Sequence, residues 1–91
     1  MTENGAVDIP IEGTLDLHTF RPDEVKDLVP HYLDACRGKG ILQVRIVHGK
    51  GTGTLQRIVR SILEKLQYVE SYHTADETGG GWGATIVLLK K

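Results

Sequence analysis

The alternation of apolar and polar positions along the chain predicts four strands and two helices in the order βαβαββ. Around Leu15 to His18 the pattern has the period of a strand that is buried on one face. A run rich in branched aliphatic residues, which ends at His48, indicates a second and more deeply buried strand. Two more strands are expected later in the chain. The four predicted strands cover residues 13–18, 41–48, 68–74 and 84–90.

Two amphipathic helices are predicted between these strands. The first begins at Pro22, because proline suits the first turn and the two acidic residues after it face the positive helix end. Its apolar positions keep helical spacing until Gly38 ends it, so Pro30 is expected to kink the helix without breaking it. The second helix has a continuous apolar stripe formed by Leu55, Ile58, Val59, Ile62, Leu63 and Leu66.

This order predicts an α+β fold, a two-layer sandwich of a four-stranded mixed sheet with both helices on one face. Right-handed crossovers make the first three strands parallel, and the fourth is expected to be antiparallel beside a neighbour. On the first strand, Leu15 and Leu17 point to the helices, whereas Asp16 and His18 point to the partly open face. A chain of 91 residues holds one domain, expected at 12–91 behind a flexible arm at 1–11.

Cysteine content and hydropathy exclude several classes of protein. One cysteine, Cys36, supports neither a disulfide framework nor a structural zinc site of the usual kind. The longest purely aliphatic run, 86–89, is far too short to span a membrane, and the N-terminus lacks a signal pattern. A cytoplasmic protein without membrane contact is therefore expected.

Charge is distributed unevenly along the chain. The net charge of −1 at pH 7 argues against a protein that coats nucleic acid by bulk charge. Residues 1–36 carry two basic and eight acidic side chains, however, whereas residues 37–65 carry seven basic and one acidic. These bases either pair with the acids of the first third or form a basic surface.

The loop between the second strand and the second helix is the first candidate site. Glycines allow backbone N–H groups to approach an anion, the helix N-terminus adds positive potential, and a lysine adds a full charge. A phosphate is the expected ligand, although a glycine-rich turn without a ligand is the alternative. Neither the nucleotide-binding P-loop pattern nor the dinucleotide pattern fits the spacing of the glycines. The residues of this loop are His48, Gly49, Lys50, Gly51, Thr52 and Gly53, and Thr52 or Thr54 is expected to cap the helix.

The second candidate is the pair Asp16 and His18 at the end of the first strand. A period of two places both side chains on one face, where the carboxylate can orient the imidazole or raise its basicity. If the first two strands are parallel, His18 and His48 lie at corresponding carboxyl ends, the edge where open α/β sheets bind ligands. Two histidines beside a phosphate site predict acid–base chemistry on a phosphodiester. Each residue alone has a structural alternative, as a turn cap or as a polar strand end.

A third candidate is Trp82, which lies in the glycine-rich segment before the last strand. So many glycines indicate mobility or a close approach of the backbone to a neighbour. The indole either stacks on a nucleic-acid base or folds back onto the core.

Three segments together resemble the Smr (small MutS-related) domain, in its stand-alone bacterial type. They are residues 15–18, the H-G-x-G-x-G segment 48–53 and residues 81–85, and the resemblance covers about residues 12–90. It implies a fold like the C-terminal domain of the third bacterial translation initiation factor. It also implies nicking or cleavage of DNA, or endonucleolytic cleavage of RNA. The family commonly has glycine after the first-motif histidine, where this chain has Thr19.

The resulting hypothesis is an endonuclease that acts on the backbone of DNA, branched or supercoiled, or of RNA. His18 and His48 act as acid and base, Asp16 orients an imidazole, and the glycine loop seats the phosphate. RNA supplies its own 2′-hydroxyl nucleophile and needs no metal, whereas DNA requires water and favours a divalent cation, Mg or Mn, held partly by Asp16. The phosphates that flank the cleaved bond are expected to be contacted by Arg45, Arg57 and Arg60.

Two other functions remain open at this stage. One is a non-catalytic nucleic-acid-binding or adaptor module in DNA repair, recombination or ribosome quality control, with a MutS-like or ribosomal complex as protein partner. The departure at Thr19 and the nearly neutral net charge favour it. The other is a binder of small phosphorylated metabolites that uses the same glycine loop.

Overall fold

The computed structural model describes residues 11–49, 53–75 and 83–91 and confirms the predicted order of elements. Each strand begins and ends within two residues of its expected position. No helix in the described ranges has the length and apolar character needed to cross a membrane. The elements are β1 (Thr14–Asp16), α1 (Pro22–Gly38), β2 (Gln43–Val47), α2 (Thr54–Lys65), β3 (Val69–Thr74) and β4 (Ala84–Leu89).

The four strands form one mixed sheet in the order β1-β2-β4-β3. β1 and β2 are parallel, and β4 is antiparallel to both β2 and β3. The first three strands therefore run in one direction and the fourth runs against them, as expected. β3, however, is hydrogen-bonded to β4 and not to β2, because β4 is inserted between them.

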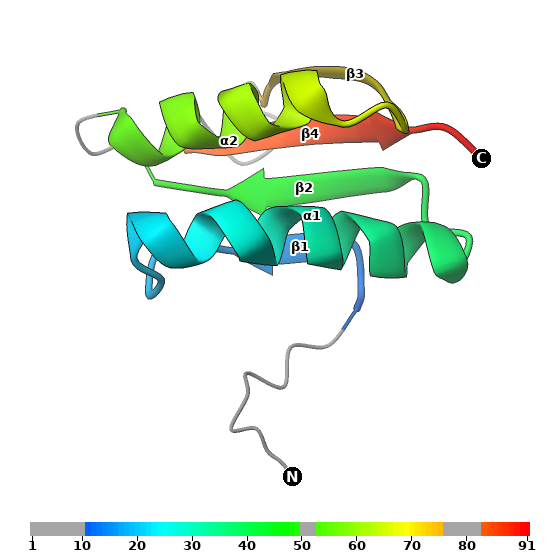
Figure 1. The fold of residues 1–91 in the computed structure, drawn as a ribbon, viewed down its shortest axis with the longest axis horizontal. Helices are drawn as coiled ribbons and strands as arrows, with labels where there is room; N and C mark the ends of the chain where they lie inside the picture. Colours follow the sequence, from blue (N-terminus) through cyan, green and yellow to red (C-terminus); the bar gives the residue numbers. More distant parts are fainter. Residues whose placement is uncertain (1–10, 50–52, 76–82) are drawn as a thin grey trace, which may run out of the picture.

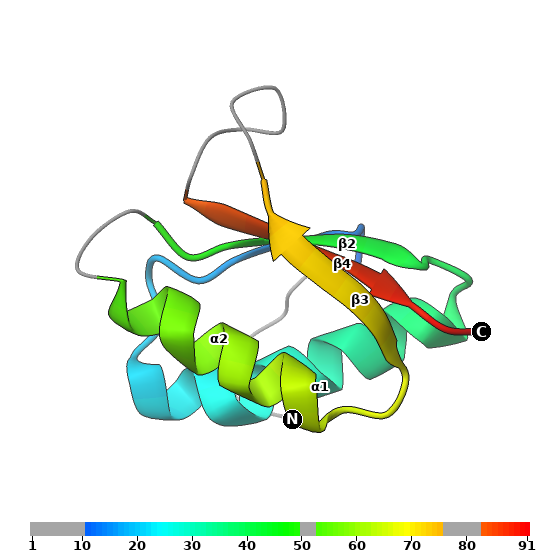
Figure 2. The ribbon, with the colours of Figure 1, turned by 90° about the horizontal axis from the view of Figure 1, so that it is seen from above.

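Both helices cover the same face of the sheet, as Figures 1 and 2 show, which confirms the two-layer sandwich. α1 lies over β1 and β2, whereas α2 lies on the side of β4 and β3. α1 continues through Pro30 as a single helix, because the apolar residues on either side of the proline stay in phase and pack together. The core between the layers consists of Leu15, Leu17, Val25, Val29, Tyr32, Leu33, Cys36, Val44, Ile46, Val59, Leu63, Val87 and Leu89.

The start of β1 is tied to the middle of α1 by the buried hydroxyl of Tyr32. This hydroxyl donates to the carbonyl oxygen of Thr14 at 3.0 Å and accepts from the backbone N–H of Gly13 at 3.1 Å. α1 itself begins with a hydrogen bond from the backbone N–H of Arg21 to the carboxylate of Glu24 at 2.8 Å. These bonds fix the start of β1 against α1 and the first turn of α1.

The face of the sheet away from the helices carries the side chains that alternate with the core positions. The strand register aligns Arg45 with Thr14 on one side and with Ile86 on the other. His73 continues the same row on β3. Asp16 shares the side of Thr14, since a strand alternates its side chains with a period of two.

Candidate functional site

Asp16 and His18 form a close pair at the carboxyl end of β1. Nδ1 of His18 lies 2.6 Å from Oδ1 of Asp16, and the backbone N–H of His18 donates to the same oxygen at 3.0 Å. Both side chains are exposed, with 68% of the His18 side chain accessible to solvent. The sequence expectation that the carboxylate orients this imidazole is consistent with this geometry.

The carboxylate of Asp16 is held in its charged form. The backbone N–H and the ring of His18 both donate to it, and these hydrogen bonds lower the pKa of Asp16 from its usual value. Nδ1 of His18 therefore carries the proton in this pair, and Nε2 is the nitrogen that faces solvent. A ring fixed in this tautomer can accept a proton at Nε2 or, once protonated, donate one there.

His48 has a different environment, because it is buried. The residue is 5% exposed. Nε2 lies 2.8 Å from the hydroxyl oxygen of Thr85, and Nδ1 lies 3.1 Å from the carbonyl oxygen of Gly49. A carbonyl only accepts, so Nδ1 is the donor. In the neutral ring, Nε2 then accepts from the Thr85 hydroxyl.

The neutral form of His48 is favoured by its surroundings. Burial lowers the pKa of His48 from its usual value, and the positive charge of Arg60 acts in the same direction. The hydrogen bond to Gly49 opposes this shift. The ring is thus a neutral structural group that links β2 to β4 and to the beginning of the glycine loop.

The described residues show no hydrogen bond between the rings of His48 and His18, and the expectation that both rings face a common point stays a prediction. Val44, Ile46 and His48 alternate along β2 toward the helices. The ring of His18, by contrast, is bonded to Asp16 on the exposed side of β1.

The two glycine-rich loops meet at Gly49 and Gly83. The carbonyl oxygen of Gly83 accepts from the backbone N–H of His48 at 2.8 Å and from that of Gly49 at 2.9 Å. A Cβ at position 83 would lie 3.2 Å from the backbone of Gly49. The second and third motifs are therefore joined by direct backbone contact, and a glycine at 83 permits it.

The start of α2 forms a small hollow lined by Gly53, Gln56, Arg57 and Arg60, with a volume of about 260 Å³. Gly53 is the cap residue, with a left-handed φ of 86° and without a side-chain cap. This differs from the expected threonine cap. The hollow is lined by the first residues of a helix and by two arginines, which is the composition of an anion-binding surface.

The two arginines of this hollow are held differently. The guanidinium of Arg60 donates to the hydroxyl of Thr74 on β3, and its buried Nε has no hydrogen-bond partner among the described residues. Arg57 is exposed and is not in an ion pair with another described residue. Arg45, the third predicted phosphate contact, lies on the open face near Asp16 and not in this hollow.

Other predicted site residues have no described position. Lys50, Gly51, Thr52 and Trp82 lie outside the described residues. Sequence reasoning missed Thr85 and Thr74 as partners of His48 and Arg60. Thr85 alternates with the core residues Val87 and Leu89, and a hydroxyl at a core position was a signal for a buried polar partner.

The described residues contain no group of three histidine, cysteine, aspartate or glutamate side chains that could hold a metal ion. Asp16 nevertheless offers one exposed carboxylate. Mg²⁺ is commonly bound by one or two carboxylates, several waters and substrate phosphates, so Asp16 is compatible with such an ion.

A two-layer βαβαββ sandwich with a D-x-H pair and an H-G-x-G-x-G loop at one sheet edge defines a class of small α+β domains. The sequence matches the Smr domain model over residues 15–90, and the chain belongs to the Smr domain family. The crystal structure of the Smr domain of Thermus thermophilus MutS2 is similar, with a TM-score of 0.82 and 34% identity, over 88% of this chain and all of that one.

Further similar proteins place the chain in the same family. YdaL from Escherichia coli, a stand-alone small MutS-related protein, has a TM-score of 0.82 and 28% identity over 90% of this chain and 67% of its own. Endonuclease MutS2 of Leuconostoc mesenteroides is 39% identical over 98% of this chain and 11% of its own. Endonuclease MutS2 of Halothermothrix orenii is 40% identical over 88% of this chain and 10% of its own length. The chain thus spans about a tenth of the length of these curated relatives.

Proposed function

We propose that this domain is an endonuclease that cleaves the phosphodiester backbone of DNA or RNA. The observation that carries the proposal is the Asp16–His18 pair, an exposed imidazole held at 2.6 Å by a carboxylate at the sheet edge. The similarity to endonuclease MutS2 supports it. The basic hollow at the start of α2 supplies an anion-binding surface at the end of the loop that leaves the same edge.

His18 is the general base of this proposal. Its Nε2 takes the proton of the attacking group, while the ionised Asp16 fixes the tautomer and stabilises the imidazolium that forms. The P–O bond to the departing oxygen breaks, and this oxygen takes a proton from water. In RNA the attacking group is the adjacent 2′-hydroxyl. In DNA it is water, and a divalent cation such as Mg or Mn held partly by Asp16 would supply Lewis-acid activation.

His48 has a positioning role in this proposal, in place of the acid–base role expected from the sequence. Its ring bonds to Gly49 and Thr85 hold the beginning of the glycine loop against β4. The substrate backbone runs over the sheet edge, from Asp16, His18 and Arg45 on the open side to Gly53, Arg57 and Arg60 at the start of α2. The loop between them is expected to contact the phosphate.

A gel assay with supercoiled plasmid and structured RNA tests this function. His18→Ala is expected to lower the cleavage rate by about a hundredfold or more, the usual contribution of a general base. The matched control is His31→Ala on the exposed surface of α1, which should cleave like the wild type. Comparison of RNA with its 2′-deoxy analogue, each with and without chelator, separates the 2′-hydroxyl route from the metal-assisted route.

Equal activity of wild type and His18→Ala would contradict the proposal and indicate a contaminating nuclease. Binding without cleavage by either protein would favour the second candidate, a nucleic-acid-binding or adaptor module. The observation that favours this second candidate is the buried, neutral ring of His48, which leaves His18 as the one exposed member of the two histidines expected to act together.

A further inference from the structure

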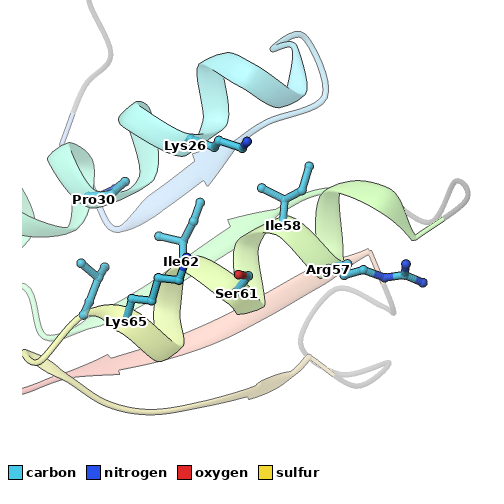
Figure 3. Close-up of a pocket in the computed structure, with 8 residues that line it drawn as sticks. Lys26, Pro30, Arg57, Ile58, Ser61, Ile62 and Lys65 are labelled. Atoms are coloured by element: carbon cyan, nitrogen blue, oxygen red, sulfur yellow. The ribbon is translucent and has the colours of Figure 1, made fainter.

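A groove runs along the seam between α1 and α2, on the surface of the helix layer away from the sheet. Its volume is about 560 Å³. Figure 3 shows Ile58 and Ile62 rising from α2 into the seam, with Pro30 and Lys26 on the facing side of α1. Ser61, Arg57, Lys65 and Leu66 complete the lining. The floor is aliphatic, and none of the lining residues is aromatic.

The rim of this groove carries charge of one sign. Lys26, Arg57 and Lys65 line it together with no acidic residue. None of these three cations forms an ion pair with another described residue. The acidic residue of α2, Glu64, is turned to the other side, where its carboxylate accepts from the hydroxyl of Tyr72 at 2.8 Å.

Pro30 removes one backbone hydrogen bond from this part of α1. It has no backbone N–H, so it cannot give the carbonyl of Lys26 the hydrogen bond of a regular helix. Its own carbonyl accepts from the hydroxyl of Tyr68 at 3.0 Å, which fastens the adjacent connection between α2 and β3 to α1. The groove thus has an apolar floor and a basic rim, and Tyr68 fastens its end.

We propose that this groove binds an acidic amphipathic segment of a partner protein. Aliphatic side chains of the segment would pack on Pro30, Ile58 and Ile62, while its carboxylates would face Lys26 and Lys65. A nucleic acid fits less well, since bases stack on aromatic rings and its interfaces are more polar. Symmetric pairing of two copies through the groove would bring like charges together.

The test uses the full chain labelled with ¹⁵N and a synthetic helical peptide as the probe. The peptide carries leucines at i, i+3, i+4 and i+7 with glutamates at the flanking positions. Chemical-shift changes are expected at Lys26, Ser61 and Ile62, and not at Asp16 or His18. A peptide of the same composition in shuffled order should bind about tenfold more weakly or not at all.

Variants separate the groove from general charge effects. The double variant Lys26→Glu with Lys65→Glu is expected to weaken binding by about tenfold or more, because the rim becomes acidic. The matched control is Lys39→Glu, an exposed lysine at the C-terminus of α1 outside the groove, which should change affinity by less than about twofold. The Ile62→Ser variant tests the apolar floor and should also weaken binding.

Several outcomes would overturn this proposal. They are shifts confined to the open sheet face, equal affinity for the shuffled peptide, and displacement of the peptide by a single-stranded oligonucleotide at the same signals. A dimer in light scattering that Lys26→Glu dissociates would assign the groove to a second copy instead. Nucleic-acid cleavage by the groove variants should stay at the wild-type rate, so this result is independent of the proposed endonuclease function.

Discussion

Glycines at the candidate site are required for two different reasons. Gly49 and Gly53 have positive φ values of 80° and 86°, a conformation that side chains with a Cβ rarely adopt. Gly83 is required because the backbone of Gly49 lies close to the position of its absent side chain. The first reason is local to the residue, whereas the second arises from contact between two distant segments.

The close approach at Gly83 predicts the cost of adding one methyl group. Gly83→Ala places a Cβ 3.2 Å from the Gly49 backbone, so the two loops must separate. A loss of about 1–3 kcal/mol in the free energy of unfolding is expected in urea denaturation. The control is Gly38→Ala, where no atom lies within 4 Å of the added Cβ, and it should not destabilise the protein. Equal stability of both variants would contradict the contact between the loops.

The buried ring of His48 predicts an acid-sensitive component of stability. Because its folded pKa is lowered, the unfolded chain binds this proton more readily. The stability associated with His48 is therefore present above its unfolded pKa of about 6.5 and is lost as the pH falls through the lower folded value. His48→Gln retains an acceptor for Thr85 but cannot titrate, so thermal melting below about pH 6.5 should depend less on pH. An unchanged slope would mean that the ring titrates freely in the folded state.

Among the elements, the packing of α1 against β1 matters most for the candidate site. β1 is short, and it carries the Asp16–His18 pair at its end. Three residues of β1 bond to β2, and the hydroxyl of Tyr32 adds bonds to the chain entering the strand. One phenol group on α1 therefore helps to hold an edge strand in place. The candidate site depends on it although Tyr32 is not close to Asp16 in the sequence.

Removal of this hydroxyl should destabilise the protein and loosen β1. Tyr32→Phe leaves the Gly13 N–H and the Thr14 carbonyl without their partner, at an expected cost of about 1–3 kcal/mol in unfolding free energy. Hydrogen exchange should also become faster at residues of β1. Tyr72→Phe, which loses an exposed bond to Glu64, is the matched control and should cost less. A larger loss of unfolding free energy in Tyr72→Phe than in Tyr32→Phe would contradict the role assigned to Tyr32.

In the whole molecule, the described bases of the middle third do not form ion pairs across the fold with the acids of the first third. Among the described residues, the one ion pair between these blocks is local, from Arg37 to Asp34 within α1 at 3.5 Å. The guanidinium of Arg37 also lies over the ring of Tyr68, 4.5 Å from its centroid. The alternative in which the bases pair with distant acids is therefore wrong for the residues described.

This charge distribution predicts how nucleic-acid binding responds to salt. If Arg57 contacts a phosphate, Arg57→Gln should weaken binding and reduce the slope of log K against log salt by about 0.7–0.9, the value for one lost contact. Lys39→Gln at the far end of α1 is the control and should leave the slope unchanged. Filter binding or fluorescence anisotropy over a salt series measures both. An unchanged slope for Arg57→Gln would remove this residue from the interface.

Much of the fold and part of the candidate site could be predicted from local patterns. The period of two around Leu15 placed Asp16 and His18 on one side of β1, and their separation of two residues made the observed hydrogen bond possible. α1 begins at Pro22 as predicted for the same reason, since amphipathic spacing and end signals depend on neighbours along the chain. The partners of His48 and Arg60 lie 37 and 14 residues away and have no such local signal.

The sequence by itself determined the order of the elements, the apolar faces of β1 and of the two helices, and the pairing of Asp16 with His18. Only the tertiary structure decided that β4 lies between β2 and β3, that Gly83 meets Gly49, and that Thr85 bonds the ring of His48. The physical reason is that strands pair through backbone groups that are the same in every residue. Periodicity therefore fixes which face a side chain occupies, whereas the choice of neighbouring strand follows from packing of the whole chain.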